Sequence, residues 1–191
     1  MGFTRAELEA CRGKGVPDLV GENLRLLFVG INPGLWTAAA QAHFAKRGNR
    51  FYPALCLAGL TDHVIDASAG FRPEDAAHLI SKGIGITNLV NEATARADEL
   101  AADQLRLGGH DLQQKVARLR PVVVVILGLT AYRVAFGKPK AANGWQSDGL
   151  AGARLMVAGN PSGLNAHQTV ASLAEMFRQA AVVAGILRGR G

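Results

Sequence analysis

The hydrophobic pattern of the chain contains four short apolar runs, each bounded by glycine, proline or polar residues. The runs are Leu24–Gly30, Ile84–Val90, Val122–Leu127 and Leu155–Gly159. Apolar runs of this length with turn-forming residues at their ends are typical of buried strands. The run Val122–Leu127 is almost wholly β-branched, which favours a strand covered on both faces. The pattern therefore predicts a sheet whose strands lie in the interior.

Stretches with helical periodicity or high alanine content separate these runs. We expect helices over Phe51–Ala58, Arg72–Ser81, Glu99–Arg120, Ala131–Phe136 and Gln168–Leu187, a helix beginning within Trp36–Lys46, and one helical turn near Thr4–Cys11. Gly108 and Gly109 predict a break or kink in the stretch Glu99–Arg120. Lys138–Ala153 is expected to be a loop, with a hairpin around Trp145.

The alternation of strands and helices predicts an α/β fold, in which a mostly parallel central sheet lies between two helical layers as a three-layer α/β/α arrangement. The length of 191 residues fits one domain and no internal boundary interrupts the pattern, so residues 1–191 are predicted to form a single domain. Residues 1–23 are polar and glycine-dotted, and we expect them to be a loosely attached N-terminal segment.

The charge of the chain narrows the choice of partner. The sequence has 21 Lys and Arg residues against 15 Asp and Glu residues, which gives a formal net charge of +6. A basic balance favours an anionic partner, nucleic acid above all, because basic side chains neutralise phosphates. On charge alone, a basic enzyme with scattered and solvated charges is an equally good interpretation.

Cysteine and histidine are too scattered for a metal site. Cys11 and Cys56 make no disulfide framework, and no histidine approaches a cysteine or another histidine at metal-ligand spacing. We therefore expect no structural or catalytic metal. The N-terminus lacks the apolar core of a signal peptide, and no apolar run is long enough to span a membrane. We expect a soluble, cytoplasmic monomer.

Two loops that contain an Asn-Pro dipeptide follow two of the predicted strands. They are GINPG at Gly30–Gly34 and NPSGL at Asn160–Leu164. Ligands bind beyond the carboxyl ends of parallel strands, so the two loops should face one cleft if their strands are neighbours. The chain has no GxGxxG, GxxxxGK[ST] or GxSxG motif, which argues against a nucleotide cofactor and against a nucleophile elbow. A nucleophilic pair of Ser162 and His167 is a weaker alternative.

These loops, with NRF at Asn49–Phe51 between them, resemble the mismatch-specific uracil-DNA glycosylases. Those enzymes are bacterial relatives of thymine-DNA glycosylase in the uracil-DNA glycosylase superfamily. The resemblance runs from about Leu26 to Val182. It implies an enzyme that flips a damaged base out of the duplex and hydrolyses its N-glycosidic bond, leaving an abasic site.

The resemblance also assigns roles in a base pocket. Asn32 matches the residue that positions the hydrolytic water, although an asparagine before Pro33 is also a common turn former. An amide does not ionise usefully, so it aligns water rather than acting as a strong base. The residues implied to stack on the flipped base or to line its pocket are Phe44, Ile31, Thr37 and Asn160.

Contacts with DNA are implied for the second Asn-Pro loop and for the basic segment Lys46–Arg50. Leu164 would fill the gap left by the flipped base as an intercalating wedge, and the alternative is a leucine tucked into the core. Ser162 would hold phosphates, while Gly163 and Asn165 would meet the opposite strand. The basic segment is either a solvated turn or a phosphate-contacting loop. In the second case its DNA-binding residues are Lys46, Arg47, Asn49 and Arg50.

The loop after the second predicted strand contains a further catalytic candidate. Glu92 is the only acid in Asn91–Thr94, and a carboxylate is a better general base than an amide. Ala93 is a possible position of an acid that alanine has replaced. Asn88, at the end of the same strand, stands where relatives can have lysine. The sequence leaves open whether Asn32 acts alone or shares catalysis with an acid of this loop.

The resemblance thus predicts a monofunctional glycosylase that needs no cofactor and removes uracil from double-stranded DNA. G:U mismatches are the preferred substrate, and other damaged pyrimidines are further candidates. Two alternatives belong to other classes of protein. A nucleoside N-glycosidic hydrolase would act on free deoxyuridine, and a non-catalytic module would bind damaged DNA without releasing a base.

Overall fold

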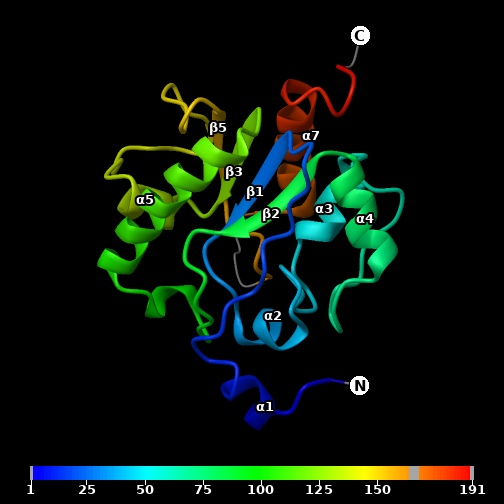
Figure 1. Ribbon diagram of the computed structural model, residues 1–191, viewed down its shortest axis with the longest axis vertical. Helices are drawn as coiled ribbons and strands as arrows, with labels where there is room; N and C mark the ends of the chain where they lie inside the picture. The colour runs from blue at the N-terminus through cyan, green and yellow to red at the C-terminus, as the bar shows by residue number, and fades with distance from the viewer. Residues whose placement is uncertain (1, 164–167, 190–191) are drawn as a thin grey trace.

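The computed structural model describes residues 2–163 and 168–189. Within them, five strands form one sheet in the order β2-β1-β3-β5-β4 (Figure 1). The strands are β1 (Leu26–Gly30), β2 (Ile84–Asn88), β3 (Val123–Leu127), β4 (Gly144–Trp145) and β5 (Arg154–Ala158). All neighbours pair in parallel except β4, which pairs antiparallel with β5. The four predicted strands and the hairpin around Trp145 are confirmed.

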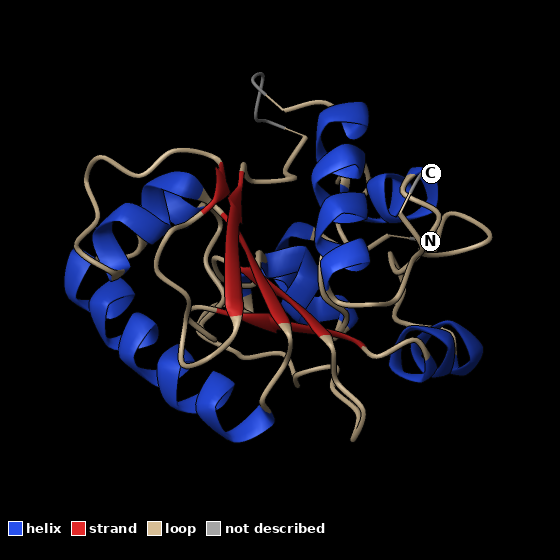
Figure 2. Ribbon diagram, turned by 90° about the horizontal axis from the view of Figure 1, so that it is seen from above, coloured by secondary structure: helices blue, strands red, loops and turns tan. Residues whose placement is uncertain are grey.

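Helical layers cover both faces of the sheet, which confirms the predicted α/β/α fold (Figure 2). One layer contains α3 (Phe51–Leu57), α4 (Pro73–Ser81) and α7 (Val170–Val183), and the other contains α5 (Ala102–Leu119) and α6 (Leu129–Ala135). Every residue of β1, β2 and β3 is buried, as their continuous apolar sequences require. In the described part of the chain, no helix is both long and apolar enough to cross a membrane.

Two shorter helices lie beyond the carboxyl ends of the strands (Figure 1). They are α1 (Arg5–Glu9) and α2 (Leu35–Ala40). The helix expected to begin within Trp36–Lys46 begins at Leu35 and ends at Ala40, because Gln41 adopts a left-handed conformation with φ of 50°. The chain then turns again at Phe44, whose φ is 55°. Because of these two turns, residues 41–50 form a loop at the edge of the sheet.

The predicted break in the helix before Pro121 is wrong. Helix α5 runs without interruption through Gly108 and Gly109, both of which are buried. A Cβ atom on Gly108 would lie 2.3 Å from the carbonyl oxygen of Leu89, and one on Gly109 would lie 2.9 Å from that of Ala135. The glycines therefore allow α5 to approach its neighbours closely, and they do not interrupt it.

The N-terminal segment is also more firmly held than expected. Leu19 exchanges two backbone hydrogen bonds with Ile86, which extends the sheet beyond β2. The Asp18 carboxylate accepts a hydrogen bond from the Thr87 hydroxyl (2.6 Å) and pairs with Lys115 Nζ (2.7 Å). These contacts join residues 18–19 to β2 and α5, so the segment is part of the domain rather than a loosely attached lead-in.

Candidate functional site

A cavity of about 400 Å³ opens at the carboxyl ends of the parallel strands. Ile31, Asn88, Leu127 and Asn160, at or just beyond the ends of β1, β2, β3 and β5 respectively, all line it. Strands β1 and β5 are not neighbours, because β3 lies between them. Both Asn-Pro loops nevertheless reach one cavity, since all parallel strands end at the same edge of the sheet.

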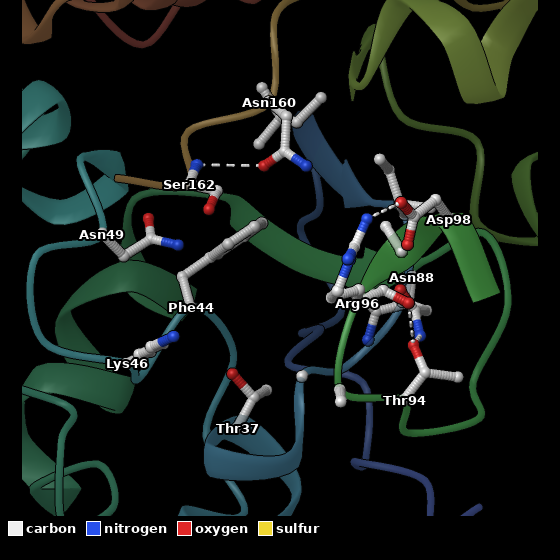
Figure 3. A pocket seen from close by; sticks show the side chains of 16 residues that line it. Thr37, Phe44, Lys46, Asn49, Asn88, Thr94, Arg96, Asp98, Asn160 and Ser162 are labelled. Atoms are coloured by element: carbon white, nitrogen blue, oxygen red, sulfur yellow. Dashed lines mark hydrogen bonds and ion pairs between the residues drawn. The ribbon is translucent and has the colours of Figure 1, made fainter. Parts of the chain in front are cut away.

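Most of the predicted site residues lie at this cavity. The predicted residues that line it are Ile31, Asn32, Thr37, Phe44, Lys46, Asn49, Asn160 and Ser162 (Figure 3). The predicted residues that are described but do not line it are Arg47, Arg50, Glu92, Ala93 and Gly163. Leu164 and Asn165, the predicted wedge and its neighbour, lie outside the described residues, as does His167.

The side chain of Asn32 is held by two hydrogen bonds from one end of its amide. Its Nδ2 donates to the backbone oxygen of Glu92 and to the hydroxyl of Thr94, each at 2.8 Å. The Thr94 hydroxyl in turn donates to the backbone oxygen of Arg96 at 2.7 Å. Both amide hydrogens are thus used, and within the described chain no donor is assigned to Asn32 Oδ1. The amide is fixed with its acceptor atom available.

Thr94 is a site residue that sequence reasoning missed. It lines the cavity, and its backbone N–H donates to the Pro33 carbonyl (3.2 Å). A parallel bridge to Gly34 joins the same two loops. Thr94 offers a hydroxyl rather than the carboxylate that a general base would require. A polar residue six positions beyond the end of β2 was the available signal.

Neither Glu92 nor position 93, the two candidate positions for a catalytic acid in that loop, places a carboxylate at the cavity. The Glu92 carboxylate accepts a hydrogen bond from the Gln104 side chain of α5 (3.0 Å). Ala93 is buried in a small apolar cluster with Val16, Leu35 and Ala38. An acid at position 93 would therefore enter an apolar environment, where ionised carboxylates are strongly disfavoured. Glu92 contacts the site through its backbone oxygen.

Phe44 forms one wall of the cavity, and its ring is supported from behind. The ring stacks on Phe51 with a centroid separation of 4.1 Å. Gly30 lets it approach the end of β1, because a Cβ atom there would lie 3.2 Å from Phe44 Cζ and 2.6 Å from Asn88 Oδ1. The left-handed backbone of Phe44, uncommon for a residue with a side chain, presents the ring in this position.

Asn88 is a second residue whose role sequence reasoning missed, and a buried histidine orients it. Asn88 Nδ2 lies 3.3 Å from His43 Nδ1, and His43 Nε2 lies 2.9 Å from the carbonyl oxygen of Pro17. Burial lowers the pKa of His43, so the ring is neutral near pH 7. With Nε2–H donating to Pro17, Nδ1 is the acceptor for Asn88. The Asn88 amide is therefore held in one orientation.

The opposite wall of the cavity carries an ion pair. Figure 3 shows Arg96 and Asp98 across the cavity from Phe44 and Lys46, and Arg96 Nη2 is paired with Asp98 Oδ2. Lys46 is exposed at the rim on the Phe44 side. The rest of the lining carries no charge and combines polar residues such as Thr37, Asn88 and Asn160 with the apolar Ile31 and Leu127. Such a lining suits a neutral ligand that forms hydrogen bonds better than it suits a phosphate.

The segment Lys46–Arg50 divides into two parts. Lys46 and Arg47 are exposed, whereas Asn49 and Arg50 are partly buried. Asn49 Oδ1 accepts from the backbone N–H of Phe51 (2.9 Å). The guanidinium of Arg50 donates to backbone oxygens of the second Asn-Pro loop. In that loop, Asn160 Oδ1 accepts from the N–H of Ser162 at 2.9 Å.

Two comparisons with known proteins bear on this site. A family model described as the uracil DNA glycosylase superfamily matches residues 17–181. Every residue that lines the cavity falls within that range. A solution NMR structure of a protein from Methanosarcina acetivorans, provisionally described as a uracil DNA glycosylase, is similar with a TM-score of 0.60 and 14% identity. The match covers 88% of this chain and 98% of that one, and at this identity it shows a shared fold.

Proposed function

Since this chain belongs to the uracil DNA glycosylase superfamily, we propose that it removes uracil from double-stranded DNA, with a preference for G:U mismatches. The reaction is hydrolysis of the N-glycosidic bond, which leaves an abasic site. A mispaired base costs least to flip out of the stack, and the preference for mismatches follows from that difference. We place the chain in the mismatch-specific branch on the strength of its two Asn-Pro loops.

The anchored amide of Asn32 carries this proposal. Its Nδ2 is held by Glu92 and Thr94, so Oδ1 is placed to accept a hydrogen bond from a water molecule at the cavity. An amide oxygen orients water without removing its proton in advance. The catalysis we propose therefore depends on alignment of the water beside a departing base, as the sugar gains cationic character.

The walls of the cavity supply the base site. The Phe44 ring offers a stacking surface, and Ile31 and Thr37 enclose the base from the β1 side. Asn88 presents an amide that can pair with the carbonyl and N–H groups of a pyrimidine, and Asn160 belongs to the same lining. Because His43 fixes the orientation of the Asn88 amide, we propose that Asn88 contributes to the choice of base.

We propose that the loop after β2 holds Asn32 in place and takes no direct part in the chemical step. Glu92 acts through its backbone oxygen, which fixes Asn32, and we assign no proton transfer to its carboxylate. Ala93 supports the loop from its apolar side. For DNA, we propose phosphate contacts for the exposed Lys46 and Arg47 and for Ser162. The wedge assigned to Leu164, with Gly163 and Asn165 beside it, remains part of the proposal by resemblance.

The test is a panel of labelled duplexes that each contain one altered base pair, followed by alkali cleavage of abasic sites. We expect base release from uracil opposite guanine to exceed release from uracil opposite adenine and from normal pairs. Asn32→Ala should slow release by about 100-fold, because it removes a preorganised polar group at the reacting centre. Binding of the variant to the mismatched duplex should stay within about threefold of the wild type.

The two rival functions give different results in the same assay. Release of base from free deoxyuridine at a rate equal to that from DNA would identify a nucleoside hydrolase. A tight, salt-dependent complex with mismatched duplex and no base release would identify a DNA-binding module. Full activity of Asn32→Ala would remove that residue from the mechanism.

A further inference from the structure

The guanidinium of Arg50 is bound to the backbone of the second Asn-Pro loop. Its Nη1 donates to the Ser162 carbonyl at 3.0 Å, and its Nη2 donates to the Gly163 carbonyl at 3.3 Å. The backbone N–H of Arg50 donates to the Pro161 carbonyl at 2.9 Å. Arg50 thus donates hydrogen bonds to the carbonyl groups of three successive residues. The planar fork of donors in a guanidinium suits this arrangement, which a single ammonium cannot reproduce.

The backbones of the two loops also meet directly beside this contact. A Cβ atom on Gly163 would lie 2.8 Å from the carbonyl oxygen of Gly48, so residue 163 has no room for a side chain. Both loops contribute walls to the cavity, through Lys46 and Asn49 on one side and Ser162 on the other. Arg50 therefore holds together two parts of the cavity rim.

The same residue is tied to the stacking ring. Arg50 is the residue before α3, and the first residue of that helix is Phe51. The Phe51 ring is buried and supports Phe44. The contacts of Arg50 thus extend from the support of the stacking ring to the last described residues before position 164.

We propose that Arg50 is a positioning residue, which fixes residues 161–163 against the wall formed by Phe44, and that it is not a phosphate contact. This inference rests on the proposed function. A loop that is held in place can stay in contact with a duplex while a base rotates out of the stack and enters the cavity. In single-stranded DNA the base is already unpaired, so the fixed loop matters less. Loss of Arg50 should therefore impair action on duplex more than action on a single strand.

The first test compares Arg50→Gln and Arg50→Lys with Lys46→Gln in single-turnover assays. The substrates are a G:U duplex and a single-stranded oligonucleotide of the same sequence. Both Arg50 variants should lose at least about tenfold in rate on the duplex and less than about threefold on the single strand. Equal losses on the two substrates would show a general structural role and would overturn the inference.

The salt dependence of duplex binding separates positioning from phosphate contact. A lost phosphate contact makes the negative slope of log K against log salt less steep by about 0.9. Lys46→Gln should show this change, and Arg50→Gln should keep the slope of the wild type. Lys140→Gln, at an exposed residue that does not line the cavity, is the control. If the slope for Arg50→Gln becomes less steep by as much as that for Lys46→Gln, Arg50 contacts a phosphate and the inference is overturned.

Hydrogen exchange of the free protein gives a readout that needs no activity. The Ser162 N–H, held by Asn160 Oδ1, should exchange at least about tenfold faster in Arg50→Gln and at an unchanged rate in Lys46→Gln. Unchanged exchange in Arg50→Gln would overturn the inference. If the wild type releases no uracil from either substrate, the proposed function fails, and the exchange rates still decide whether Arg50 holds the loop.

Discussion

At the scale of single residues, the site depends on amides that other groups hold in place. Asn32 was predictable, because it lies in a recognisable motif directly after an apolar strand. Its anchor was not predictable, because Thr94 is 62 residues away and only the pairing of β1 with β2 brings the two together. The same holds for Asn88 and His43, which are 45 residues apart. Sequence identifies a candidate site residue more easily than the groups that orient it.

Thr94→Val should lower the rate of base release by about tenfold, because it removes a hydroxyl that accepts from Asn32. A hydrogen bond of this kind contributes about 1–1.5 kcal/mol, which corresponds to that factor. Thr94→Ser keeps the hydroxyl and should stay within about threefold of the wild type. Single-turnover rates on a G:U duplex measure the effect, and equal losses in the two variants would mean that the hydroxyl is not the relevant group.

Protonation of His43 should destabilise the protein and weaken the hold on Asn88. Burial lowers the pKa of His43, with Lys115 acting in the same direction and with the Pro17 carbonyl and Asp18 opposing it. The unfolded chain therefore takes up the proton more readily than the folded protein. The free energy of unfolding should fall as the pH drops below about 6.5, and above that value His43 should contribute no pH dependence.

Denaturant unfolding between about pH 5 and pH 8 measures this dependence, with base release followed over the same range. His43→Gln removes the titrating group and should flatten the part of the profile that belongs to it. His110→Gln, on an exposed part of α5, is the matched control. A profile that is the same in His43→Gln and in the wild type would assign the pH dependence to other groups.

At the scale of elements, the strands were predictable and the packing of the helices was not. Each apolar run lies in the sheet with its ends within two residues of the expected positions, because continuous burial leaves a continuous apolar sequence. The break expected in α5 does not occur. This error arose where glycine serves a tertiary contact, which local propensity does not record.

Gly108→Ala should destabilise the protein by about 1–3 kcal/mol, because the new methyl group would collide with the Leu89 carbonyl. The clash outweighs the gain of about 1 kcal/mol from replacing glycine inside a helix, so the net change is destabilising. Gln113→Ala, on the exposed face of α5, should change stability by less than about 0.5 kcal/mol. Urea unfolding compares the two, and a stabilised Gly108→Ala would mean that α5 can move away from the loop after β2.

At the scale of the whole molecule, the order of the strands decides which loops meet. The sequence indicated a parallel sheet and two loops that share a cleft, but it did not indicate that β3 lies between β1 and β5. The sequence also contained no sign of how the N-terminal segment is attached, because the segment is held by contacts of single residues such as Asp18 and Leu19. Contacts of this kind leave no periodic pattern in a polar, glycine-rich stretch.

Removal of residues 2–20 should therefore lower the melting temperature by at least about 5 °C, since it strips the ion pair with Lys115 and the extra pairing on β2. Removal of residues 2–9 alone deletes α1 and keeps Asp18 and Leu19, so its effect should be smaller. Calorimetry of the two truncated proteins beside the full chain measures the difference. Equal melting temperatures for the longer truncation and the full chain would restore the view of a loosely attached segment.

The short strand β4 has a consequence for crowding on DNA. Its two residues pair with Met156 and Val157, and the next residue, Gln146, donates its backbone N–H to Leu155. The middle of β5 is thereby paired within a single molecule, and the edge that remains on this side of the sheet is only two residues long. An open border would let strands of adjacent copies join into an extended sheet. Under the proposed function, copies that bind at closely spaced lesions should therefore remain separate molecules.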